Sequence, residues 1–242
     1  MCLIVLAYRV HPHYPLIVAA NRDEFRMRPA APAHFWDDAP ELVAGRDLQA
    51  GGTWLGITRS GRFAALTNHR DLRRAPLQGP SRGHLVRQAL EGGIDPAATA
   101  VFEGFNLLHG PVHALRYHTN ITGADEALAP GIHGLSNALL NTPWPKVERA
   151  KVALAQVLAQ GPAPAALFDL LADATVAADA QLPDTGLPLE QERAVSSIFI
   201  AGAQYGTRCS TVVLVDTEGQ VHFEERTHPG GEVVVHRLVS GA

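Results

Sequence analysis

The sequence predicts an α+β fold in which mainly antiparallel sheets are covered by helices. Short apolar runs rich in Val, Ile and Leu occur near both ends of the chain, and amphipathic segments separate them in groups. Because strands and helices are grouped and do not alternate regularly, a strictly parallel α/β sheet is disfavoured. A length of 242 residues is sufficient for one large core, so we expect a single domain over residues 1–242.

Two pairs of strands are expected in the first part of the chain. The predicted strands cover residues 3–8, 16–20, 53–58 and 62–67. The breaker His11-Pro12-His13 separates the first pair, and Ser60-Gly61 provides a hairpin turn for the second. Residues 25–50 contain three prolines and are expected to form a long loop, which in a domain of this size is often functional.

Helices are predicted from the spacing of apolar side chains. Ser81 is a suitable N-cap for a helix that Gly92-Gly93 ends, and Asp95-Pro96 is expected to open a shorter one. The residues expected on the buried face of the first helix are Leu85, Val86, Ala89 and Leu90. Residues 145–160 form the clearest amphipathic helix, and a further helix is expected at about residues 165–174.

Further strands are expected in the middle of the chain and at its end. They cover residues 105–108, 112–118, 132–135, 197–201, 211–216, 221–225 and 233–238. Turn residues such as Gly110-Pro111 separate them. The order along the chain is therefore strands, helices, strands, helices, strands.

Composition and charge narrow the possible functions. The formal net charge of −4 gives no field that attracts phosphate backbones, so we expect no nucleic-acid partner. No run reaches the roughly 18 apolar residues of a membrane span, and the first residues lack the basic leader of a signal peptide, so we expect a cytoplasmic protein. The two cysteines, Cys2 and Cys209, are too few for a disulfide framework, which agrees with a reducing compartment. The oligomeric state stays open.

Cys2 is the candidate nucleophile. Its small side chain would allow an aminopeptidase to remove Met1, which leaves a thiol and a free α-amine on one residue. An α-amine has a reference pKa of about 7.7 to 8.0, so it can accept a proton at neutral pH. The alternative is that Cys2 is only a small hydrophobic residue at the start of a buried strand.

Four polar residues, Asn21-Arg22-Asp23-Glu24, directly follow the second predicted strand. If the first two strands are antiparallel, this segment and Cys2 lie at the same end of the sheet. Arg22 would then stabilise the thiolate, and Asp23 would hold the α-ammonium. The alternative is a solvated turn with local ion pairs.

Other candidate site residues follow strands. Asn68 and Asn137 come directly after the predicted strands 62–67 and 132–135, where their amides could donate to a developing oxyanion, although asparagine also favours turns. Arg208 precedes the strand at 211–216 and places a second cation at a strand entrance. His109, His113 and His118 do not have the spacing of a helical zinc site, and no phosphate loop or dinucleotide motif is present, so no metal or cofactor is expected.

Eight short motifs together resemble a known family. They are Met1-Cys2-Leu3-Ile4, Asn21-Arg22-Asp23-Glu24-Phe25, Gly52-Thr53-Trp54-Leu55-Gly56, Leu66-Thr67-Asn68-His69-Arg70, Ser81-Arg82-Gly83, Gly104-Phe105-Asn106-Leu107, Gly134-Leu135-Ser136-Asn137 and Tyr205-Gly206-Thr207-Arg208. Each is weak alone, but all eight in this order resemble the NRDE-motif proteins, the transport and Golgi organisation protein 2 family. The resemblance extends over the whole chain.

That family is similar in turn to the cysteine branch of the N-terminal nucleophile (Ntn) hydrolases, which contains penicillin V acylases and bile salt hydrolases. The resemblance implies a four-layer αββα sandwich, Cys2 as nucleophile and base, and Asn68 and Asn137 in the oxyanion hole. In the acylases two residues separate the arginine from the aspartate, whereas Arg22 and Asp23 are adjacent. Adjacent side chains on a strand face opposite ways, so Arg208 remains the alternative cation beside Cys2.

The sequence leads to two functional hypotheses. The first is an Ntn-type cysteine amidohydrolase that cleaves an amide or thioester of a small acyl substrate through an acyl-Cys2 intermediate. The second is a non-enzymatic carrier of haem, lipid or acyl-CoA that uses the same pocket. The family resemblance implies these apolar ligands, and Cys2 or a histidine could ligate haem iron.

Overall fold

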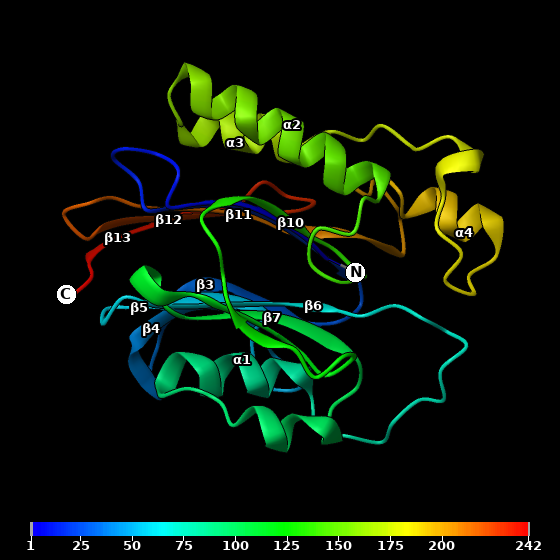
Figure 1. Cartoon of the computed structure of the whole chain (residues 1–242), viewed down its shortest axis with the longest axis horizontal. Helices are drawn as coiled ribbons and strands as arrows, with labels where there is room; N and C mark the ends of the chain where they lie inside the picture. The colour runs from blue at the N-terminus through cyan, green and yellow to red at the C-terminus, as the bar shows by residue number, and fades with distance from the viewer. Residues whose placement is uncertain (1, 242) are drawn as a thin grey trace.

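The computed structural model describes residues 2–241 and contains two β-sheets packed face to face between helices (Figure 1). Helices α2 and α3 lie on the outer face of the first sheet, and α1 lies on the outer face of the second. The layers therefore run helix, sheet, sheet, helix. This arrangement confirms the predicted α+β class and the αββα sandwich implied by the family resemblance.

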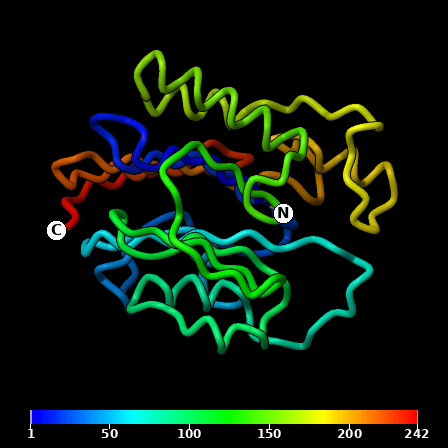
Figure 2. The backbone as a smooth tube through the Cα atoms, in the orientation of Figure 1, coloured from blue at the N-terminus to red at the C-terminus, as the bar shows by residue number. Residues whose placement is uncertain are grey.

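The first sheet combines the two ends of the chain. Within residues 2–241 its strand order is β10-β1-β2-β11-β12-β13, and neighbouring strands pair antiparallel. The bounds are β1 (Cys2–Tyr8), β2 (Leu16–Phe25), β10 (Gly131–Leu135), β11 (Tyr205–Val215), β12 (Gln220–Thr227) and β13 (Val233–Val239). Figure 2 shows the N-terminal strands lying beside the C-terminal ones, which makes β2 an interior strand.

The second sheet is an antiparallel meander. Its described strands follow one another in space in the order of the sequence, from β3 to β9. Their bounds are β3 (Ala30–Trp36), β4 (Ala39–Asp47), β5 (Leu55–Thr58), β6 (Arg62–Asn68), β7 (Phe105–Pro111), β8 (Arg116–Thr119) and β9 (Asp125–Ala127).

The helices agree well with the predicted ones. Their bounds are α1 (Arg82–Glu91), α2 (Pro145–Gln160), α3 (Pro164–Leu171) and α4 (Leu189–Ala194), with 3₁₀ turns at Pro96–Val101, Val112–Ala114 and Asp179–Gln181. Ser81 caps α1, as predicted, and accepts a hydrogen bond from the Gly83 backbone at 3.4 Å. The predicted buried face of α1 is confirmed. None of the helices in the described part of the chain is long and apolar enough to cross a membrane.

The alternation of side chains along β2 determines where the polar residues at its end point. Leu16, Val18 and Ala20 belong to the core between the sheets, whereas Ile17 and Ala19 pack in the core beneath α2 and α3. Continuing the same period of two, Arg22 faces the other sheet and Asp23 faces the helical layer. The end of β2 therefore presents opposite charges to opposite sides of the sheet.

The expected loop at residues 25–50 is wrong, because this segment contains β3 and β4. Pro32 lies within β3, which is an edge strand where a missing N–H donor is tolerated. The alternative of a solvated turn at Asn21-Arg22-Asp23-Glu24 is also wrong. These residues continue β2, and pairing with both β1 and β11 keeps the segment extended.

Smaller errors concern the ends of elements. The expected strand at residues 197–201 is irregular, the expected strand at 112–118 is divided into a 3₁₀ turn and β8, and β11 begins at Tyr205, six residues earlier than predicted. The short helix at Asp95-Pro96 is a 3₁₀ helix. The sequence analysis did not predict β9 or α4. Each is short, and so carries little periodic signal.

Gly52→Ala should destabilise the protein, because a Cβ at Gly52 would overlap the backbone of Gly83 where α1 begins. We expect the free energy of unfolding to fall by about 1–3 kcal/mol, measured by urea denaturation. Gly92→Ala is the matched control, since its Cβ would meet nothing within 4 Å and its φ of −174° suits any residue. We expect the control to stay within about 0.5 kcal/mol of the original protein. Equal effects of the two substitutions would contradict this account.

Candidate active site

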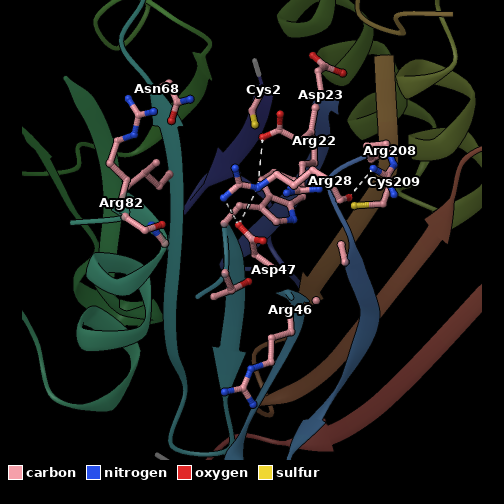
Figure 3. A pocket seen from close by; sticks show the side chains of 18 of the residues that line it. Cys2, Arg22, Asp23, Arg28, Arg46, Asp47, Asn68, Arg82, Arg208 and Cys209 are labelled. Carbon is pink, nitrogen blue, oxygen red and sulfur yellow. Dashed lines mark hydrogen bonds and ion pairs between the residues drawn. The ribbon is translucent and has the colours of Figure 1, made fainter. Parts of the chain in front are cut away.

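A cavity of about 440 Å³ opens between the two sheets at the end where β1 starts and β2 ends (Figure 3). Figure 3 shows Cys2 between Asn68 on one side of the cavity and Arg208 with Cys209 on the other. The residues that line this cavity include Cys2, Arg22, Asp23, Asn68, Arg82, Arg208, Cys209 and Glu225. The structure thus brings five of the six predicted site residues to one cavity.

Cys2, Arg22 and Cys209 form a row across three neighbouring strands. Cys2 is directly opposite Arg22, and Arg22 is directly opposite Cys209. Residues in register project from the same face of a sheet, so Arg22 lies between the two thiols. The two cysteines are two strands apart, roughly 10 Å between Cα atoms, which is too far for a disulfide.

Cys2 is partly buried and packs against the core between the sheets. Burial raises the pKa of its thiol, while the positive charge of the amino terminus, the backbone N–H of Asp23 and the Arg22 guanidinium act in the opposite direction. The thiol is therefore protonated at neutral pH. It needs a base to become a nucleophile.

Arg22 is the cation directly opposite Cys2 in the sheet. Its side chain is 9% exposed, and it has no hydrogen-bond acceptor or ion-pair partner among residues 2–241. The other arginines of the cavity are held by neighbours: Arg28 pairs with Asp47 at 2.6 Å, and Arg82 donates to the Gly104 carbonyl at 3.0 Å. Arg22 is thus available to a negative charge that develops at Cys2.

Asp23 faces the helical layer, on the side of the sheet opposite to Arg22. Its carboxylate accepts a hydrogen bond from the Thr207 hydroxyl at 2.7 Å, and its carbonyl accepts one from the Tyr205 hydroxyl at 3.1 Å. Burial raises the pKa of Asp23, while the charges of the amino terminus and of Lys146 oppose that rise. Asp23 therefore lies on the helical side of the sheet, whereas Arg22 lies on the side of the Cys2 sulfur.

The two asparagines have different positions. Asn68 ends β6 and lines the cavity that contains Cys2. Asn137 is fully buried outside that cavity, and its side-chain nitrogen donates to the Asn68 carbonyl at 2.8 Å. Asn137 also lines the adjoining cavity, so it borders the site and holds Asn68 in place.

Arg208 lies in a β-bulge and has other partners. Its guanidinium donates to the carbonyls of Phe25, Arg26 and Arg28 at 2.9–3.0 Å. The bulge places Thr207 opposite Asp23 and Cys209 opposite Arg22, with Arg208 as the extra residue. Between the two candidate cations, this geometry favours Arg22 for an electrostatic role at Cys2.

The sequence analysis missed several buried ionisable residues near the site. Lys146, in the first turn of α2, is 2% exposed and donates to the Val195 carbonyl at 3.1 Å. Arg70 and Glu192 form a buried ion pair at 2.7 Å. Lys146 shares the apolar face of the predicted helix with Val147, Ala150 and Leu154, and this signal could have identified it. Arg70 and Glu192 do not lie on the apolar face of a predicted helix, so no such pattern indicated that they are buried.

Glu225 and Cys209 complete the deep side of the cavity. Burial raises the pKa of the Glu225 carboxyl, and its oxygens accept hydrogen bonds from the Ala33 backbone at 2.8 Å and the Thr211 hydroxyl at 3.3 Å. Glu225 alternates with the inward residues Val221 and Phe223 along β12, so its position was predictable. Residues 2–241 contain no cluster of three or more His, Cys, Asp or Glu side chains suited to a metal ion.

A second, larger cavity of about 1550 Å³ adjoins the first. The residues that line both cavities are Glu24, Asn68, Arg82 and Glu103. Apolar side chains of the second cavity include Phe25, Leu77, Phe102, Ile121, Phe199 and Ile200. The site therefore combines a small polar chamber at Cys2 with a wide, more apolar one beside it.

Comparison with known proteins agrees with the resemblance found in the sequence. A family model described as Transport and Golgi organisation 2 matches residues 1–229. The Transport and Golgi organization protein 2 homolog of Bos taurus is 37% identical over 96% of this chain and 95% of its own, and that of Homo sapiens is 35% identical over 94% and 93%. A solved structure of the C2A mutant of conjugated bile acid hydrolase from Clostridium perfringens has a TM-score of 0.57 at 5% identity, covering 100% of this chain and 94% of that one. At this identity the similarity shows the fold alone.

Proposed function

Because the chain belongs to the Transport and Golgi organisation 2 family and has the fold of an Ntn hydrolase, we propose that it is a cysteine hydrolase that cleaves an amide or thioester of a small acyl substrate. The observation that carries the proposal is the position of Cys2. Cys2 lines a cavity directly opposite Arg22 in the sheet, and the positive charge of the amino terminus acts to lower the pKa of Asp23. The similar bile acid hydrolase was solved as its C2A mutant, so that protein also has a cysteine at its second position.

In the proposed reaction, removal of Met1 exposes the α-amine of Cys2. The amine takes the thiol proton while the sulfur attacks the substrate carbonyl and forms a tetrahedral oxyanion. Collapse of this intermediate breaks the bond to the leaving group, and the α-ammonium returns the proton to that group. A water molecule then attacks the acyl-Cys2 thioester, the amine accepts the water's proton, and the free acid leaves with the thiol restored.

The surrounding residues have separate tasks in this proposal. Arg22 stabilises negative charge on the sulfur, Asp23 orients the amine, and the Asn68 amide donates to the oxyanion. Asn137 supports Asn68 through the hydrogen bond to its carbonyl. Arg208, which was the alternative cation, holds the backbone after β2 in position.

Replacing Cys2 should abolish covalent acylation. Incubation of the purified protein with p-nitrophenyl butyrate should release one equivalent of p-nitrophenolate in a burst and leave a butyryl group on Cys2, detected by intact and peptide mass spectrometry. Intact mass also shows whether Met1 has been removed. Cys2→Ala should give neither burst nor adduct, whereas Cys209→Ala should keep both. An adduct on Cys2→Ala equal to that on the original protein would exclude Cys2 as the nucleophile.

Asn68→Ala should slow acylation without abolishing it. Removing one oxyanion donor costs on the order of 10²-fold in rate. We expect this loss in the burst rate constant, while the thiol still alkylates with iodoacetamide at the original rate because the sulfur keeps its surroundings. Thr227→Ser, at another polar position that lines the cavity, should stay within about twofold of the original rate. An unchanged burst in Asn68→Ala would remove Asn68 from the oxyanion site.

The larger cavity supports the second hypothesis, a non-enzymatic carrier of haem, lipid or acyl-CoA. Its apolar lining and about 1550 Å³ suit a large apolar ligand, and the half-buried His69 on its wall could ligate haem iron. Haem would be held there by apolar contacts and an axial histidine.

A haem titration distinguishes the two functions. A carrier should give a saturable absorbance change with micromolar haem, and His69→Ala should weaken it at least tenfold. His84→Ala, an exposed histidine outside both cavities, should leave it unchanged. A spectrum that haem does not alter would argue against the carrier, whatever the outcome of the acylation experiment.

A further inference from the structure

Lys146 is a buried cation on the helical side of the first sheet, where Asp23 also points. It is the second residue of α2 and only 2% exposed, and its single described hydrogen bond is to the Val195 carbonyl. The charged and titratable groups that act on it electrostatically are Asp23 from β2, Arg70 after β6, Glu192 from α4 and, from the other side of the sheet, Cys2 from β1. Lys146 is neither the nucleophile nor the base nor an oxyanion donor of the proposed reaction.

Within this cluster the positive and negative charges nearly balance, so an additional cation would be unfavourable. Arg70 and Glu192 form an ion pair at 2.7 Å, and the positive charges that act on Asp23 are the amino terminus first and Lys146 second. The Thr207 hydroxyl donates to Asp23 and favours its ionised form. Arg22 adds a further positive charge from the other side of the sheet. A protonated α-amine would then be a surplus cation in a site with little water, which is unfavourable.

We propose that Lys146 is a positioning residue that neutralises Asp23 and thereby keeps the α-amine of Cys2 in its neutral, basic form. This inference rests on the proposed function, because it assigns a task to Lys146 only if the amine is the base. Without Lys146, the α-ammonium would lose its main competitor for Asp23, because Lys146 is the second positive charge acting on that carboxylate after the amino terminus. Pairing of the α-ammonium with Asp23 would favour the protonated amine, which cannot accept the thiol proton.

The charge state of Lys146 determines the pH range in which it neutralises Asp23. Burial lowers the pKa of Lys146 to about 8, although Asp23 acts to raise it. Below pH 8 the side chain is therefore mainly an ammonium and neutralises Asp23. The effect on the α-amine is largest at neutral and slightly acidic pH, where a free amine is hardest to maintain.

The test is the pH dependence of the burst of p-nitrophenolate from p-nitrophenyl butyrate. Lys146→Met and Lys146→Gln both remove the charge, and glutamine can still donate to the Val195 carbonyl. In both variants we expect the midpoint of the acid limb to rise by about one pH unit, which lowers the rate about tenfold at pH 6.5. The rates should converge with the original protein at high pH. Lys146→Arg keeps the charge and should keep the original midpoint.

The possible outcomes separate this inference from the proposed function. If the original protein shows no burst, the hydrolase itself is excluded. If it shows a burst but the neutral variants have an unshifted midpoint, or lose the same fraction of rate at every pH, Lys146 has only a structural role. Circular dichroism establishes that each variant is folded. Should both neutral variants fail to fold, a midpoint in Lys146→Arg raised by about one unit would overturn the inference by itself.

Discussion

The antiparallel register of β1, β2 and β11 is the constraint on which the site depends. It places Cys2, Arg22 and Cys209 in one row, so a thiol at the first strand has a guanidinium beside it without any contribution from a loop. Interior pairing holds this row rigidly, because β2 is hydrogen-bonded on both sides. A group on a rigid element is positioned more accurately than one on a mobile connection.

The same strand separates two electrostatic environments. Between the sheets, Arg22 borders a cavity that contains the sulfur, and behind the sheet, Asp23 is enclosed by Lys146, Thr207 and Tyr205. The period of two along a strand is sufficient to produce this division. In the proposed reaction, adjacent residues of opposite charge can therefore act on the sulfur and on the amine of a single cysteine, although adjacent side chains on a strand face opposite ways.

Sequence patterns predicted the parts of the structure that are periodic or local. The spacing of apolar residues identified α1 and α2, and the strand ends identified Cys2, Asn68 and Arg22 as neighbours of one cavity. The β3–β4 hairpin was not predicted because Pro32 is tolerated in β3 only by virtue of the strand's edge position, which is a property of the whole sheet. Likewise, the Arg70–Glu192 pair joins residues 122 positions apart, and no local pattern encodes such a contact.

The bulge at Arg208 allows Thr207 and Cys209 of β11, which are two residues apart, to project from opposite faces of the sheet. In a regular strand Thr207 and Cys209 would project from the same face, but the inserted residue directs the first toward Asp23 and the second toward Arg22. Deletion of Arg208 would move the Thr207 hydroxyl away from Asp23 and toward the cavity that contains Cys2. Length variation among relatives should therefore be confined to connections such as 69–80, because a single-residue deletion at the bulge would rearrange both chambers at once.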